Sequence, residues 1–107
     1  MPLSDSNQEI YMVITNEADK INASKLANLL LREKLIPCVN FKTIESHFWW
    51  GGEINQSKEV ELMIKCKEEN VKKVCNKISE LHSYEVPEII YFRVSANKNY
   101  HQWVNSI

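Results

Sequence analysis

The sequence predicts an α+β protein with a ferredoxin-like split β-α-β sandwich, in which two helices cover one face of an antiparallel sheet. Three observations lead to this prediction. Four strand-like stretches and two stretches of helical period follow one another in the order βαββαβ. The only two glycines of the chain stand side by side between two strand-like stretches, as in a hairpin. The 107 residues, of which 44% are hydrophobic, suffice for one domain with one core.

The first strand and the first helix follow a polar leader, residues 1–8, which we expect to be flexible, so the single domain spans residues 9–107. Residues 9–15 are aliphatic and β-branched on both faces, which is typical of a central strand covered by helices. Asp19 is the expected N-cap of a helix that ends near Lys34. Its buried face is formed by apolar residues at steps of three and four, namely Ala23, Leu26, Ala27, Leu30 and Leu31.

A hairpin is expected next, because an extended stretch over residues 35–50 is followed by Gly51 and Gly52 and by a second arm that ends in residues 59–66. The end of the second arm alternates between a buried and a solvent-facing set of side chains. The buried set is Val60, Leu62, Ile64 and Cys66, and the solvent-facing set is Glu59, Glu61 and Lys65.

The predicted hairpin is too long for its own domain. At ~3.3 Å per residue, arms of about fourteen residues make a ribbon of roughly 45 Å, against a radius of gyration near 13 Å for a compact domain of about 100 residues. The tip carries bulky aromatic side chains, Phe48, Trp49 and Trp50, that a small monomer cannot cover. We therefore expect neighbouring subunits to cover them.

The second half of the chain supplies the remaining helix and strand. A helix is expected over about residues 68–82, and residues 88–94 read as the fourth strand. The apolar stripe of this helix consists of Val71, Val74, Cys75, Ile78 and Leu81. A short amphipathic helix at the C-terminus is predicted from Tyr100, Trp103, Val104 and Ile107.

Composition excludes several classes of function. A net charge of −1 offers no basic field for nucleic acid. The sequence contains no stretch typical of a signal peptide or a membrane span, and its three cysteines lack C-x-x-C spacing, which suggests reduced thiols. We therefore expect a cytoplasmic protein without nucleic-acid or membrane partners. The sequence also lacks a glycine-rich phosphate loop, a G-x-S-x-G elbow and an H-E-x-x-H pair, so we predict that it is not an enzyme.

A set of metal-ligating residues remains. Cys38 begins the second strand, His82 ends the second helix, and the carboxylates of Glu85 and Glu88 follow directly. Thiolate and imidazole together suit copper or zinc. The alternative is structural, because a cysteine in an apolar strand is commonly a small buried hydrophobe and a histidine at a helix end commonly caps carbonyls.

Two aromatic residues, Trp50 and Tyr84, allow a second hypothesis. They are either packing groups or the lining of a cleft between subunits, where their N–H and O–H groups would contact a small ligand. The closeness in sequence of His82, Tyr84 and Glu85 is the only hint of catalysis.

Three strings, residues 36–40 (IPCVN), 46–54 (SHFWWGGEI) and above all 81–89 (LHSYEVPEI), resemble those of the CutA divalent-cation tolerance family. They occur in the family's order and at its spacing. The resemblance implies a ferredoxin-like subunit in a tight homotrimer whose long hairpins wrap around neighbours. It also implies a cytoplasmic protein of metal tolerance, with copper and other divalent ions as ligands and no settled enzymatic activity. Cys38 and His82 match the residues most often put forward for copper.

The sequence departs from the family's usual pattern at Pro37, Trp49, Gly51, Ser83 and at Phe48, where tyrosine is common. With the resemblance added, we predict a trimeric protein of divalent metal (copper) tolerance or response. Cys38, His82 and Glu85 would bind the ion weakly, and no cofactor would be required. The alternative is a trimeric signalling or scaffold protein that binds a small ligand or an unidentified partner protein in its inter-subunit clefts.

Overall fold

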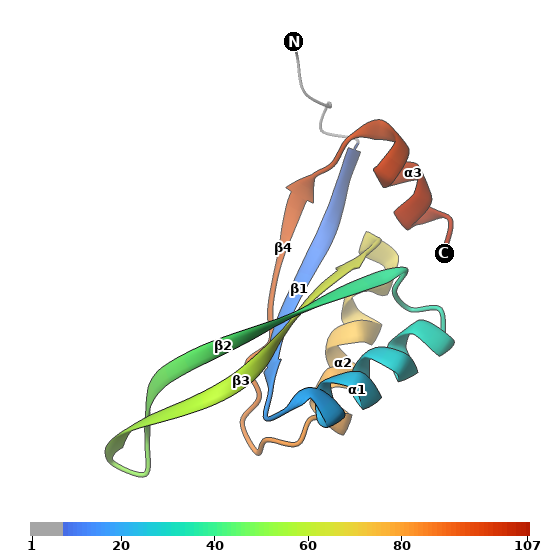
Figure 1. Cartoon of the computed structure of the whole chain (residues 1–107). Coiled ribbons are helices and arrows are strands. Elements are labelled where there is room, and N and C mark those ends of the chain that lie inside the picture. Colours follow the sequence, from blue (N-terminus) through green and yellow to red (C-terminus); the bar gives the residue numbers. More distant parts are fainter. Residues whose placement is uncertain (1–7) are drawn as a thin grey trace.

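The computed structural model describes residues 8–107, which form a four-stranded antiparallel sheet with helices α1 and α2 on one face (Figure 1). The elements are β1 (Glu9–Glu17), α1 (Lys20–Arg32), β2 (Cys38–Trp50), β3 (Glu53–Cys66), the 3-10 turn η2 (Glu68–Asn70), α2 (Val71–Leu81), β4 (Ile90–Ser95) and α3 (Lys98–Asn105). The strand order β2-β3-β1-β4 is that of the ferredoxin-like sandwich, so the predicted fold is confirmed. Apart from Gln8, the predicted polar leader lies outside the described residues.

The core lies between the sheet and the two covering helices. β1 is central and pairs with β3 on one side and with β4 on the other, with Val13 opposite Ile64. The fully buried side chains of this core come from every element that borders it: Val13, Ala23, Leu30, Ile36, Leu62, Ile64, Cys66, Val74 and Ile78. α1 begins where Asp19 accepts a hydrogen bond from the backbone N–H of Asn22 at 2.8 Å, so the predicted N-cap is confirmed.

Three details of the predicted helices are wrong. Leu31 and Leu81 are 37% and 50% exposed, because they lie at the edge or end of their helices rather than over the sheet. The second helix does not start at Glu68, since its first turn is the 3-10 turn η2. That turn is fixed by Asn70, whose buried side chain donates to the carbonyl of Leu35 at 3.1 Å. The bond ties the start of α2 to the segment that follows α1.

The β2–β3 hairpin extends well beyond the helix-covered sheet (Figure 1). Its arms stay in continuous register from Cys38 opposite Lys65 to Trp50 opposite Glu53. Gly51 and Gly52 adopt φ values of +63° and +76°, as a two-residue hairpin turn of mirror-image type requires. The molecule therefore measures 47 Å along its longest axis, in line with the predicted ribbon.

The sheet face opposite α1 and α2 is apolar but only partly covered. Ile14 and Met12 of β1 lie on this face opposite their partners Ile90 and Phe92 of β4. α3 contacts β1 and β3 and buries Val104, yet Ile90 and Phe92 remain 49% and 42% exposed. A second apolar surface thus stays open in the single chain. None of the helices in residues 8–107 is long and apolar enough to cross a membrane.

Candidate functional site

A groove of about 760 Å³ lies between the β2–β3 hairpin and the connecting segment, residues 82–89, that joins α2 to β4. We call it the hairpin groove. Its lining combines apolar, polar and acidic side chains: Asn16, Ser46, His47, Phe48, Trp50, Ser57, Glu59, Ser83, Tyr84, Glu85, Val86 and Glu88. Trp50 and Tyr84 were expected to be either packing groups or the lining of a cleft between subunits. In the structure both line this groove within one chain.

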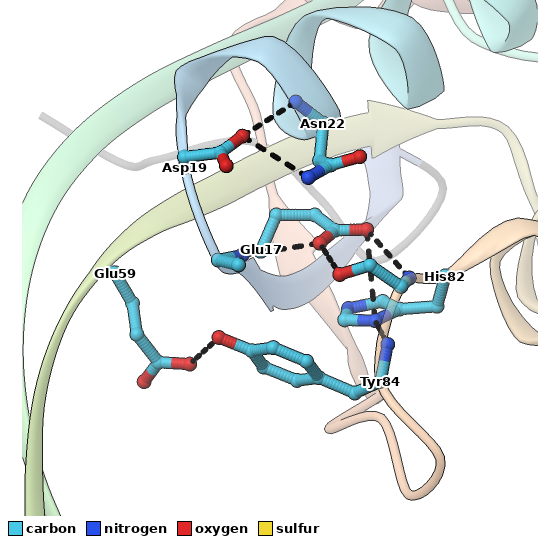
Figure 2. A network of polar contacts seen from close by, with 8 residues as sticks. Glu17, Asp19, Asn22, Glu59, His82 and Tyr84 are labelled. Atoms are coloured by element: carbon cyan, nitrogen blue, oxygen red, sulfur yellow. Dashed lines mark hydrogen bonds and ion pairs between the residues drawn. The ribbon is translucent and has the colours of Figure 1, made fainter.

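A buried carboxylate, Glu17, fixes the connecting segment to the end of β1 (Figure 2). Its side chain is only 1% exposed and accepts hydrogen bonds from the backbone N–H groups of Ala18 and Ser83, both at 3.1 Å. The hydroxyl of Ser83 donates to the same carboxylate. Since a buried carboxylate needs such donors, Glu17 and Ser83 hold each other in place.

The imidazole of His82 packs directly beside Glu17 and has no exposed side-chain surface. Its Nδ1 atom lies 3.6 Å from a Glu17 oxygen and accepts a hydrogen bond from the Tyr84 backbone N–H at 3.1 Å. This pattern assigns the proton of the neutral ring to Nε2, an atom that is buried without a hydrogen-bond partner. A metal ion at Nε2 would require the other tautomer, in which Nδ1–H faces Glu17, the arrangement common in carboxylate–histidine–metal sites.

A second carboxylate, Glu59, holds the other side of the connecting segment. The hydroxyl of Tyr84 donates to Glu59 at 2.6 Å, and Glu59 is 7% exposed (Figure 2). Burial raises the pKa of Tyr84, as do its hydrogen bond to Glu59 and the nearby negative charges, so the phenol stays protonated. Burial and the charges of Glu59 and Glu61 also raise the pKa of Glu88. The hairpin groove therefore concentrates negative charge.

The predicted metal ligands are not brought together within one chain. Glu85 lines the hairpin groove and His82 lies beside it, whereas Cys38 pairs with Lys65 toward the opposite end of β3. Lys65 lies six positions after Glu59 on β3, or about 20 Å away at ~3.4 Å per residue. Across residues 8–107 there is no group of three or more His, Cys, Asp or Glu side chains that could hold a metal ion.

The other two cysteines are structural. Cys66 is fully buried in the core, where burial, and to a lesser degree the neighbouring Cys75, raises its pKa to about 12. Burial also raises the pKa of Cys75, which packs against the same core. Metals bind the thiolate form, so these two protonated thiols are poor ligands at neutral pH.

Two residues that organise this site were missed from the sequence. Glu59 was assigned to the solvent face with Glu61, but the connecting segment covers it through Tyr84, a contact 25 residues away in the chain. Glu17 carries a signal that could have found it, because it lies two residues after Thr15 and four after Val13, in phase with buried positions. A charged residue in such a phase needs partners inside the fold.

Comparison with known proteins identifies the family. The family model described as "CutA1 divalent ion tolerance protein" matches residues 11–107. The chain belongs to the CutA1 family. The Divalent-cation tolerance protein CutA of Pyrococcus horikoshii is 36% identical over 96 residues, which cover 89% of this chain and 94% of the relative. The family resemblance of the three strings is therefore confirmed.

Solved CutA structures have the same fold. CutA1 from Ehrlichia chaffeensis superimposes with a TM-score of 0.88 at 33% identity, over 94% of this chain and 96% of the other. CutA from Archaeoglobus fulgidus, described as a periplasmic divalent cation tolerance protein, gives a TM-score of 0.86 at 27% identity, over 92% and 96% of the two chains. The match spans the hairpin as well as the helix-covered core, because both coverages exceed nine-tenths.

Proposed function

We propose that this CutA1-family protein is a homotrimer that takes part in the response to divalent metal ions, copper among them, and binds such ions weakly. The observation that carries the proposal is the buried imidazole of His82, whose Nε2 atom has no protein partner and whose Nδ1 atom lies beside Glu17. Glu85 lines the adjoining hairpin groove and would add an oxygen ligand. Two ligands are fewer than a tight site needs, which accords with weak binding.

The trimer is supported by the surfaces that a single chain leaves open. Ile90 and Phe92 on the sheet face are 49% and 42% exposed, and Trp49, Trp50 and Ile54 at the hairpin tip are 71%, 55% and 66% exposed. Neighbouring subunits that cover these side chains would remove a large apolar area from water. Since Cys38 and His82 lie far apart in one chain, a metal site that uses both would form between subunits.

Native mass spectrometry of the untagged protein, titrated with copper and with zinc, tests the metal proposal. We expect a trimer that takes up copper at up to one ion per subunit. The double variant Cys38→Ala/His82→Ala should remain a trimer and lose this copper. Cys75→Ala, which removes a thiol that packs against the core and is not among the proposed ligands, is the matched control and should bind as the wild type does. Unchanged copper uptake by the double variant would refute the ligand assignment.

The hairpin groove supports a second candidate function, that of a trimeric signalling or scaffold protein. A groove of about 760 Å³ with aromatic walls and a few polar groups has the size and character of a small-molecule site. In this case a ligand or partner protein would bind in the cleft whether or not metal is present. Pull-down of the same partner with and without a chelator distinguishes this function from the first.

We also propose a cytoplasmic location, no required cofactor and no catalytic activity. The three free cysteines suit a reducing compartment, although the Archaeoglobus fulgidus relative is described as periplasmic. Fractionation of cells that express the untagged protein tests the location, and recovery in the periplasmic fraction would refute it.

A further inference from the structure

The hairpin groove is lined by three carboxylates, and His47 is the one side chain of its lining that can carry a positive charge. Glu59, Glu85 and Glu88 line it, and the lining contains no lysine or arginine. Glu59 is more than nine-tenths buried, and the hydrogen bond that it accepts comes from the neutral phenol of Tyr84. A buried carboxylate without a cationic partner is unfavourable. The groove is therefore matched to a positively charged occupant.

A hydrogen-bond acceptor lies close to this carboxylate. The Oδ1 atom of Asn16 is buried without a hydrogen-bond partner, and Asn16 lines the same groove. Asn16 pairs with Glu61 across the sheet, so Glu59, two residues further along β3, is its diagonal neighbour on the same face. Side chains in such diagonal positions reach a common partner, since their Cα atoms lie about 7–8 Å apart. Asn16 and Glu59 thus lie on one face of the sheet, on neighbouring strands, and both line the groove.

The walls of the groove distinguish an organic cation from a bare metal ion. Phe48 and Trp50 line it and are 40% and 55% exposed in the single chain. In the proposed trimer they would form the wall of a cleft between subunits, where they offer apolar surface and ring faces rather than ligand atoms. Indole faces attract organic cations, and apolar walls bind the carbon part of a ligand. Within residues 8–107 no metal-binding group of three ligating side chains exists. An ammonium group brings a charge and three N–H donors, which suit Glu59 and Asn16.

We propose that the hairpin groove binds a small organic ammonium compound, with the ammonium between Glu59 and Asn16 and the carbon body against Trp50. This inference rests on the second candidate function, because it names the chemical class of the ligand in the cleft. It is independent of copper binding at His82.

Isothermal titration calorimetry with two probes of nearly equal shape tests the proposal. The full chain is titrated with 2-phenylethylamine and with 2-phenylethanol, in which a neutral hydroxyl replaces the ammonium. We expect the amine to bind at least tenfold more tightly than the alcohol. Glu59→Gln should reduce amine affinity at least tenfold without a change in oligomeric state. Glu45→Gln, which removes an exposed carboxylate of the hairpin outside the groove, should leave affinity unchanged.

The outcomes separate the ammonium proposal from the functions on which it rests. Equal binding of amine and alcohol would overturn the ammonium preference and leave the groove as a small-ligand site. If neither probe binds, both the ammonium proposal and the small-ligand function of the groove are overturned. If Glu59→Gln does not fold, Glu88→Gln at the rim should weaken amine binding about threefold, and no change would contradict the proposal. Copper uptake by native mass spectrometry reports on His82 separately.

Discussion

The helix-covered part of β3 and its distal part differ sharply, although they belong to one continuous strand. Leu62 and Ile64 are fully buried under α1 and α2, whereas Ile54, near the hairpin turn, is 66% exposed. Trp49, its partner on β2, is 71% exposed. The difference teaches that one strand serves two purposes. Its proximal half completes the core of the subunit, and its distal half leaves apolar surface open, which we propose a neighbouring subunit or a ligand covers.

The sharpest way to break this comparison is to truncate equivalent side chains in the two halves of β3. Leu62→Ala should lower the free energy of unfolding by about 2–5 kcal/mol, because it leaves a cavity in a closed core. Ile54→Ala should change the unfolding of the subunit itself by less than about 0.5 kcal/mol, since its side chain is exposed there. Urea unfolding of each variant in the Trp50→Glu background, which is expected to be monomeric, followed by circular dichroism, measures both. Similar losses in the two variants would argue against the division.

Loss of the hydrogen bonds that anchor the connecting segment should have the next largest effect on the free energy of unfolding. Glu17→Ala removes the acceptor of the Ser83 N–H and hydroxyl and should destabilise the protein by about 1–3 kcal/mol. Glu85→Ala, on the same segment but exposed, is the control and should have almost no effect on stability. Hydrogen exchange of the Ser83 amide provides a local readout. Full protection of that amide in Glu17→Ala would contradict the anchoring role.

The smallest expected effect concerns the charge in the hairpin groove. The pKa of Glu88 is raised above its ordinary value of 4.5 by burial and by the charges of Glu59 and Glu61, so the protonated form is favoured in the folded protein. The stability that this provides is present below pH 4.5 and is lost as the pH rises through the raised pKa. Glu88 is largely exposed, so solvent screening limits the effect to about 0.5 kcal/mol or less.

Glu88→Gln should therefore melt slightly higher than the wild type at pH 7, and the gain should vanish near pH 4. Thermal melts at both pH values, with Glu45→Gln as the control, measure this difference. A gain that is larger at pH 4 than at pH 7 would have the wrong sign for a raised pKa.

Much of the fold could be predicted because its signals are local. Alternation in residues 59–66, the apolar period of the two helices and the paired glycines each specify an element without reference to the rest of the chain. The extent of the hairpin followed from the length of its arms. The start of the second helix was predicted wrongly because a tertiary contact determines the local conformation there. The hydrogen bond from Asn70 to Leu35 accompanies a 3-10 turn where the helix was expected to begin.

The candidate site could be predicted only in part. Trp50 and Tyr84 were paired as one alternative and Glu85 was grouped with the metal ligands, whereas the structure places all three in the lining of one groove, because the hairpin and the connecting segment meet at the same end of the sheet. Cys38 was grouped with His82 on ligand chemistry and on the family resemblance, but the register of β2 against β3 places Cys38 toward the other end. Glu59 was missed because its burial depends on a hydrogen bond to a distant tyrosine. Residue type indicates possible ligands, whereas register and loop placement decide which of them meet.

The central claim is that the distal hairpin is an assembly surface, and native mass spectrometry of wild-type protein and Trp50→Glu tests it most directly. We expect the wild type to be a trimer. Trp50→Glu should be a monomer with an unchanged circular dichroism spectrum, because a charge buried at the interface would be unpaired while the helix-covered core is unaffected. A wild-type monomer, or a Trp50→Glu protein that remains trimeric, would contradict the claim.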